Sequence, residues 1–125
     1  MVDYFSVTLT VGHDRARLRL RGELDIAGAD ELLARFHEAC ASEPSLLLID
    51  LAELSFCDCS GIRVLLMAAE HCREKHIDIR LVGMRPNVRR TFELTHTAEV
   101  LHLGQDGSDH AKHRGFRAAP DRETA

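Results

Sequence analysis

Long apolar runs, tryptophan and a surplus of basic charge are all missing from this sequence of 125 residues. The longest purely apolar run is residues 64–69, whereas a membrane-spanning helix needs about twenty such residues. Asp and Glu outnumber Lys and Arg by 20 to 16, so the formal net charge is −4. Nucleic-acid-binding proteins and polybasic membrane anchors usually carry a basic excess. We therefore expect neither nucleic acid nor membrane as a partner.

The first residues also lack the marks of a signal peptide. Residues 1–4 contain no cationic start and no apolar segment follows them. We therefore expect a cytoplasmic protein in which the four cysteines, at positions 40, 57, 59 and 72, are free thiols. A chain of this length buries enough surface to fold as one domain without disulfides or metals.

Apolar periodicity divides the chain into strands and helices. Every second residue is apolar in residues 5–11 and again in 16–20, which predicts a hairpin of two half-buried strands. The polar side of the second strand is Arg17, Arg19 and Arg21, which we expect to be solvated. Segment 22–25 breaks this alternation.

The remainder of the chain alternates between helical and extended patterns. The further expectations are a helix at about 27–41, a buried strand at 45–51, a loop at 54–59, a helix at 60–75, a strand at 77–81, a helix at 86–94 and a strand near 100–103. Helical crossovers make the second, third and fourth strands parallel. The fold class is therefore α/β: a sandwich with a mixed four- to five-stranded sheet and helices mainly on one face.

The last residues differ in composition from the rest. Residues 104–125 are polar, show no apolar period and contain one large apolar residue, Phe116. We expect them to form a disordered tail after a domain of residues 1–103.

The junction between the buried strand and the second helix carries the most information. The start of a helix offers unpaired N–H groups and a positive dipole, so an anion is stabilised there. A phosphate at this place would add up to about two negative charges. The residues also fit a commoner arrangement, in which Asp58 or Ser60 caps the helix and Gly61 lets it pack closely on the sheet.

Four segments carry a family resemblance. They are Gly22-Glu23-Leu24-Asp25, Leu48-Ile49-Asp50-Leu51, Asp58-Cys59-Ser60-Gly61-Ile62, and Gly83-Met84-Arg85-Pro86 with the following helix. Over about residues 5–103 the chain resembles the STAS domain family of anti-sigma factor antagonists. The resemblance implies a STAS-like sandwich.

The resemblance also implies a function. Such proteins bind an anti-sigma factor, often a serine kinase with an ATPase fold, and thereby regulate sigma-factor-dependent transcription. Phosphorylation of a serine in the switch loop ends the complex. By position, Asp58 corresponds to the acid of the switch loop, Asp25 to the acid beside it, and Gly61 to the glycine at the helix start.

The sequence departs from the family at the phosphorylated position, where Cys59 replaces serine. Three hypotheses follow, in order of preference. The protein binds its partner without a phosphate switch; Ser60 has become the acceptor, although it projects about 100° away around the helix; or Cys59 is a redox switch.

The expected partner surface lies around this loop. It comprises Asp25, Phe56, Asp58, Ile62 and Arg63, beside the switch-loop residues 58–61. Ile62 either contacts the partner or packs under the loop. The alternative function is a scaffold subunit of a stress-sensing STAS assembly.

We expect no enzymatic activity, because no acid–base pair or nucleophile motif converges in the sequence, and no cofactor. Cys57-x-Cys59 lacks the two further ligands that zinc needs. Cys40 and Cys72 lie on apolar helix stripes, which is typical of small core residues.

Overall fold

The computed structural model describes residues 4–95. In chain order its elements are β1 (Phe5–Gly12), β2 (Arg15–Leu24), α1 (Ile26–Cys40), β3 (Leu46–Cys57), α2 (Cys59–Glu74), β4 (Asp78–Val82) and α3 (Pro86–Leu94). The strand expected near 100–103 and the tail expected at 104–125 lie outside the described residues. No helix within residues 4–95 is long and apolar enough to cross a membrane.

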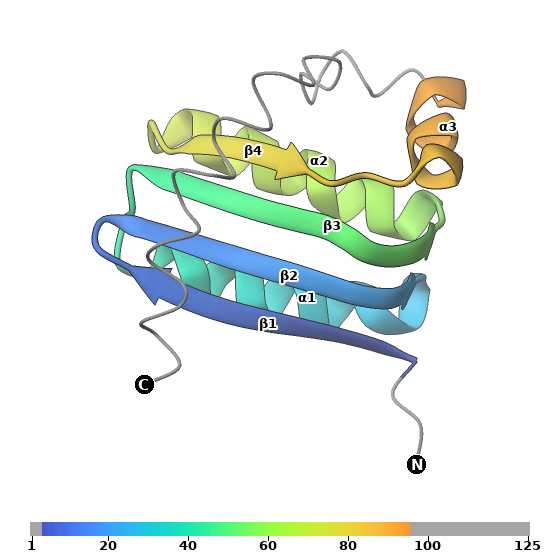
Figure 1. The fold of residues 1–125 in the computed structure, drawn as a ribbon. Helices are drawn as coiled ribbons and strands as arrows, with labels where there is room; N and C mark the ends of the chain where they lie inside the picture. Colours follow the sequence, from blue (N-terminus) through green and yellow to red (C-terminus); the bar gives the residue numbers. More distant parts are fainter. Residues whose placement is uncertain (1–3, 96–125) are drawn as a thin grey trace.

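The four described strands form one sheet in the order β1-β2-β3-β4. β1 is antiparallel to β2, whereas β2, β3 and β4 are parallel. Figure 1 shows α1 and α2 behind the sheet, with α3 at the corner beyond the end of β4. The predicted α/β sandwich with a mixed sheet and helices on one face is confirmed, because each parallel connection crosses over through a helix.

The main core lies between the sheet and the two long helices. The apolar positions of β2 are fully buried there, with Phe36 from α1, Leu65 from α2 and Phe92 from α3. The opposite face of the sheet holds a smaller buried cluster of Leu46, Leu48 and Val82. Residues 46–51 of β3 are therefore buried on both faces, as the unbroken apolar run predicted.

The prediction of a solvated arginine row was wrong for Arg17, which is only 8% exposed. Arg17 lies between two buried neighbours in register, Thr10 on β1 and Leu48 on β3. Arg19 is half exposed and pairs with Asp50 of β3 at 3.6 Å. The burial of Arg17 beside these neighbours is a property of the assembled sheet, which a single strand's pattern cannot show.

The prediction of a loop at residues 54–59 was also wrong, because β3 continues to Cys57. β2 likewise continues through the segment that breaks its alternation, and ends at Leu24. The β2–β3 pairing contains two register shifts, which let both strands continue to these ends. β3 has one residue more than β2 between Asp50 and Glu53, and one more between Leu54 and Phe56. Such bulges interrupt the period of two without ending the strand.

The C-terminal part of β3 extends beyond its pairing with β4 and is held from the side. Arg85 donates from Nε to the carbonyl of Ala52 at 3.0 Å, and Asn87 donates from Nδ2 to the carbonyl of Ser55 at 2.8 Å. On the other side, the Ser55 hydroxyl donates to the carbonyl of Gly22 at 3.1 Å. The residues that lead to Asp58 are thus fixed on both edges.

Substitution of Gly22 tests whether the C-terminal part of β2 is important for stability. Its φ is +99°, and a Cβ placed there would collide with the Tyr4 carbonyl. We expect Gly22→Ala to lower the free energy of unfolding by about 2 kcal/mol or more, measured by urea denaturation. Gly12→Ala is the control, because Gly12 is not among the glycines with positive φ. An equal effect of both substitutions would contradict the assignment.

Candidate functional site

Two aspartates cap two neighbouring helices at one end of the sheet. Leu24 and Cys57 are register partners at the ends of β2 and β3, so the next residues, Asp25 and Asp58, follow adjacent strands. Asp25 is the N-cap of α1 and Asp58 is the N-cap of α2. A hydrogen bond from the Asp58 N–H to the Leu24 carbonyl, at 3.0 Å, joins the two strand ends.

The carboxylate of Asp58 satisfies the first turn of α2. Its Oδ1 accepts the backbone N–H groups of Ser60 at 2.9 Å and Gly61 at 3.2 Å. Of the two capping candidates in the sequence, Asp58 is therefore the cap and Ser60 is not. The anion expected at this helix start is the side chain of Asp58 itself.

Asp25 holds α1 in a similar way and has an additional partner. Its Oδ1 accepts the N–H groups of Ala27 at 3.0 Å and Gly28 at 3.4 Å, and its Oδ2 accepts the Tyr4 hydroxyl at 3.0 Å. This hydrogen bond, together with the charge of Asp25, raises the pKa of Tyr4 above its usual value of 10.0. Tyr4 therefore reports on the charge at this cap.

Gly61 lets the start of α2 lie directly on the ends of β2 and β3. A Cβ at Gly61 would lie 2.6 Å from the Leu24 side chain and 2.8 Å from the Cys57 sulfur. The close packing expected of this glycine is confirmed, and any larger residue would push α2 away from the sheet.

The side chains around this end divide into buried and exposed groups. Ile62 is 4% exposed and packs in the core beneath the loop, which was one of its two expected positions. Phe56 is 47% exposed, and both Cys59 and Arg63 are exposed. The exposed side chains around the start of α2 are therefore Phe56, Cys59 and Arg63, with Ile62 beneath them.

Two further residues belong to this end and were missed from the sequence. Ile26, the first residue of α1, is 76% exposed next to Asp25, and Tyr4 is 51% exposed. Ile26 precedes Ala29 by three residues, so its spacing looks like part of the buried helix stripe. No sequence signal separates Ile26 from that stripe. Tyr4 was missed because its contact with Asp25 joins residues 21 positions apart.

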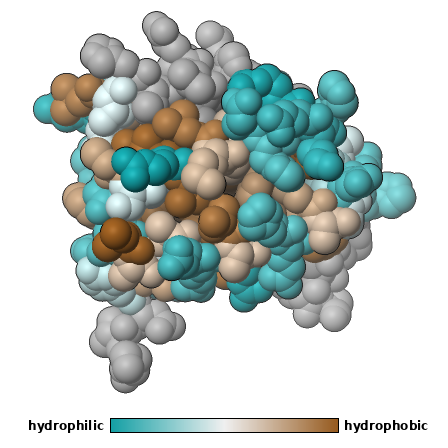
Figure 2. Space-filling view, turned by 180° about the vertical axis from the view of Figure 1, so that it is seen from behind, coloured by the Kyte–Doolittle hydropathy of each residue, from teal (hydrophilic) through white to brown (hydrophobic). Residues whose placement is uncertain are grey.

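The helical side of the molecule is not uniformly polar. Figure 2 views this side and shows hydrophobic side chains across its middle, with a block of hydrophilic side chains at the upper right. The C-terminal part of α2 and the residues after it supply exposed charged side chains, among them Glu70, Arg73, Glu74 and Lys75. The start of α2 is thus the less charged end of this helix.

The pair Cys57-x-Cys59 does not form a joint site. Cys57 is 2% exposed, and burial raises the pKa of its thiol to about 12, whereas Cys59 is exposed to solvent. Within residues 4–95 no group of three or more His, Cys, Asp or Glu side chains is arranged to hold a metal ion.

A mixed sheet whose parallel strands β2 and β3 lead directly into two Asp-capped helices on one face defines a small α/β sandwich domain. The chain belongs to the STAS domain family, whose sequence model matches residues 7–109. It is 33% identical over 92 residues to the anti-sigma-F factor antagonist RsfA of Mycobacterium tuberculosis, covering 71% of this chain and 72% of that protein. It is 26% identical over 90 residues to the anti-sigma-B factor antagonist of Listeria monocytogenes, covering 72% and 79%.

Solved structures share the fold. A crystal structure of an anti-sigma factor antagonist from Mycobacterium paratuberculosis matches with a TM-score of 0.72 at 23% identity, over 79% of this chain and 84% of that chain. The unphosphorylated form of the anti-sigma factor antagonist SpoIIAA matches with a TM-score of 0.69 at 20% identity, over 88% and 97%. At these identities the likeness establishes the fold alone.

Titration of Tyr4 tests the geometry of the Asp25 cap. Tyr4 is the only tyrosine and the sequence has no tryptophan, so absorbance at tyrosinate wavelengths reports this residue alone. We expect a midpoint above 10 in the folded protein, lower in Asp25→Asn, and at the ordinary value in urea. Because the folded pKa is raised, the stabilisation is present below pH 10 and is lost as the pH rises through the folded pKa. A midpoint unchanged by Asp25→Asn would contradict the contact.

Proposed function

We propose that this protein is an anti-sigma factor antagonist, which binds an anti-sigma factor and so regulates sigma-factor-dependent transcription. The observation that carries the proposal is the Asp58-capped start of α2, with Phe56, Cys59 and Arg63 exposed around it. Family membership supports it, because relatives named as antagonists match about seven tenths of the chain. The role is one of binding, without catalysis and without a cofactor, and its place is the cytoplasm.

The partner surface combines apolar and charged contacts. Phe56 is 47% and Ile26 is 76% exposed, and large exposed apolar side chains gain free energy when a partner covers them. Arg63 adds a cation at the rim of this surface. The carboxylates of Asp25 and Asp58, which cap the two helices, add negative charge. We propose an anti-sigma factor with a serine-kinase-like ATPase fold as the partner.

The missing serine at position 59 bears on how this binding is regulated. The neighbour SpoIIAA has been solved in a phosphorylated form as well as an unphosphorylated one. Cys59, the first residue of α2, carries a thiol in place of a hydroxyl. We propose that the protein binds its partner constitutively, because the acceptor hydroxyl is absent and the amides of Ser60 and Gly61 are already bonded to Asp58.

Two other hypotheses for regulation remain from the sequence. Ser60 is partly buried in the first turn of α2, and its N–H donates to Asp58, which makes it a less accessible acceptor than position 59. Oxidation of the exposed Cys59 is the other hypothesis. We rank both below constitutive binding.

Charge reversal on α2 tests the proposed surface. We expect Arg63→Glu to weaken binding of the anti-sigma factor by tenfold or more, measured by calorimetry. The substitution places an acid where the partner meets a cation. Asp58→Asn should also weaken binding while keeping a capping oxygen, so that the fold is preserved.

The matched control is Arg73→Glu, which makes the same charge change in the last turn of the same helix. We expect less than a twofold change there, since Arg73 pairs only locally with Glu70. Equal weakening by Arg63→Glu and Arg73→Glu would point to a long-range charge effect and remove the proposed interface.

Exposure to the cognate kinase tests the absence of the switch. We expect no mass increase of ~80 Da in the wild-type protein, and labelling in Cys59→Ser, because the substitution restores a hydroxyl at the first position of α2. Cys59→Ala is the control and should stay unlabelled. Labelling of the wild type that disappears in Ser60→Ala would instead establish Ser60 as the acceptor.

Affinity capture from the native cytosol separates the proposal from the scaffold alternative. A kinase-like ATPase as the main companion supports the antagonist function. Recovery of other STAS proteins in one large particle would instead support a structural subunit, for which the residue at position 59 has little consequence.

A further inference from the structure

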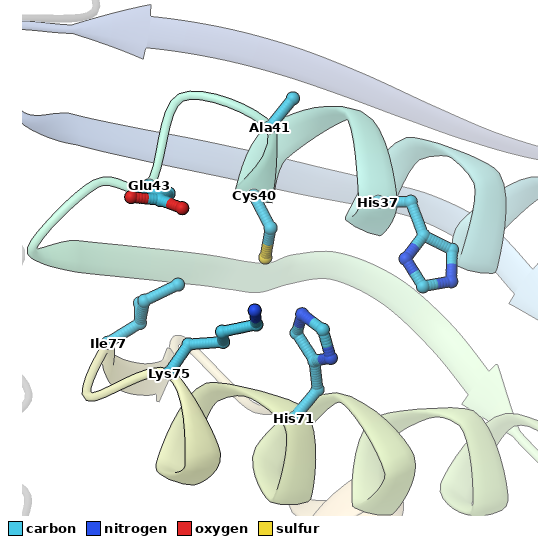
Figure 3. Close-up of a pocket in the computed structure, with 7 residues that line it drawn as sticks. All are labelled: His37, Cys40, Ala41, Glu43, His71, Lys75 and Ile77. Carbon is cyan, nitrogen blue, oxygen red and sulfur yellow. The ribbon is translucent and has the colours of Figure 1, made fainter.

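A pocket of about 260 Å³ opens at the end of the helical layer opposite to Asp58. Its lining residues are His37, Cys40, Ala41, Glu43, His71, Lys75 and Ile77 (Figure 3). They come from the C-terminal ends of α1 and α2 and from the connections that follow. Lys75 is sixteen positions after Cys59, which is roughly 24 Å along the helix axis. The pocket is therefore separate from the proposed partner surface.

The sulfur of Cys40 projects into this opening. Figure 3 shows it directed from α1 toward α2, between the side chains of Lys75 and His71. Cys40 is largely buried, but it lines the pocket, and its sulfur is the part of the side chain that faces the opening. The charged and titratable groups that line the pocket are His37 on α1, His71 and Lys75 at the end of α2, and Glu43 on the connection to β3.

A second thiol lies near Cys40 in the same core. Cys72 of α2 is fully buried, and the two side chains are close enough across the α1–α2 interface for each to affect the pKa of the other. Both cysteines belong to the main core, together with the small residues Ala39 and Ala69. Small side chains let two helices approach closely, which the short reach of a disulfide requires.

We propose that Cys40 and Cys72 are an oxidisable pair, which hydrogen peroxide entering through the pocket converts to a disulfide between α1 and α2. In the first step the Cys40 sulfur bonds to one peroxide oxygen and the O–O bond breaks, giving a sulfenic acid and water. The Cys72 sulfur then bonds to the Cys40 sulfur, the S–O bond breaks, and a second water leaves. The two thiols lose two electrons, which the peroxide accepts.

The surroundings of the two thiols make this reaction slow, so it should need a high concentration of peroxide. Burial raises the pKa of both thiols, that of Cys72 to about 12, so little thiolate is present at neutral pH. The rate should rise about tenfold per pH unit above neutrality, as the thiolate fraction does. Cys59 is exposed to the same oxidant, so the experiment below replaces it.

The disulfide would join the ends of a segment that contains all of β3 and most of α2. A cross-link restricts the unfolded chain more than the folded one. The oxidised protein should therefore resist unfolding, while the partner surface at the other end of α2 keeps its geometry. This inference does not depend on the proposed function.

The experiment uses the full chain with Cys59→Ser, treated with hydrogen peroxide and then alkylated. Cleavage after glutamate, except before proline, isolates Cys40 in residues 39–53, Cys72 in residues 71–74 and position 57 in residues 54–70. We expect residues 39–53 joined to 71–74 with the loss of two hydrogens. The thermal midpoint should rise by about 5 °C or more and return on reduction.

Two variants make the result decisive. In Cys72→Ser, the sulfenic acid of Cys40 should persist, react with dimedone and leave the thermal midpoint unchanged. In Cys40→Ser, no disulfide should form. Sulfinic or sulfonic acid at Cys40 with Cys72 still alkylated, or a link from residues 39–53 to residues 54–70, would overturn the proposal.

Discussion

The parallel pairing of β2 with β3 is the constraint on which the functional end of this protein depends. It runs to the last residue of each strand, Leu24 and Cys57, and the Asp58 N–H extends it by one hydrogen bond to the Leu24 carbonyl. Because both strands end together, both following helices begin together. The two Asp caps and the exposed side chains beside them are placed by this one alignment.

The electrostatics of this end follow from the same alignment. Two helix starts lie side by side, and each has a positive dipole end and unpaired N–H groups. Asp25 and Asp58 each accept two of those N–H groups, so each carboxylate stabilises the start of its own helix. Around the two caps, Arg63 is an exposed cation, and Phe56 and Ile26 are exposed apolar side chains.

Apolar periodicity in the sequence predicts the fold. The prediction fails at residues whose burial or conformation is set by contacts between strands. Alternation in β2 and helical stripes in α1 and α2 predict both the core and the parallel topology. The strand at residues 54–57 could not be predicted, because two bulges in β3 are defined only relative to β2. The Asp58 cap could be predicted because its hydrogen bonds go to Ser60 and Gly61, two and three positions further along the chain. Exposure of Ile26 and burial of Arg17 depend on neighbours distant in sequence, so spacing alone misassigns them.

The two bulges in β3 also affect how this gene can change in length. Each bulge holds a residue that has no partner of its own on β2, between Asp50 and Glu53 and between Leu54 and Phe56. Loss of one codon in that stretch can be absorbed by straightening a bulge, which leaves the strands in register on either side. Residues 46–49 contain no bulge that could straighten. Loss of a codon there would turn the following side chains to the opposite face of the sheet. Insertions and deletions among natural homologues should therefore gather just before Asp58 and avoid the first half of β3.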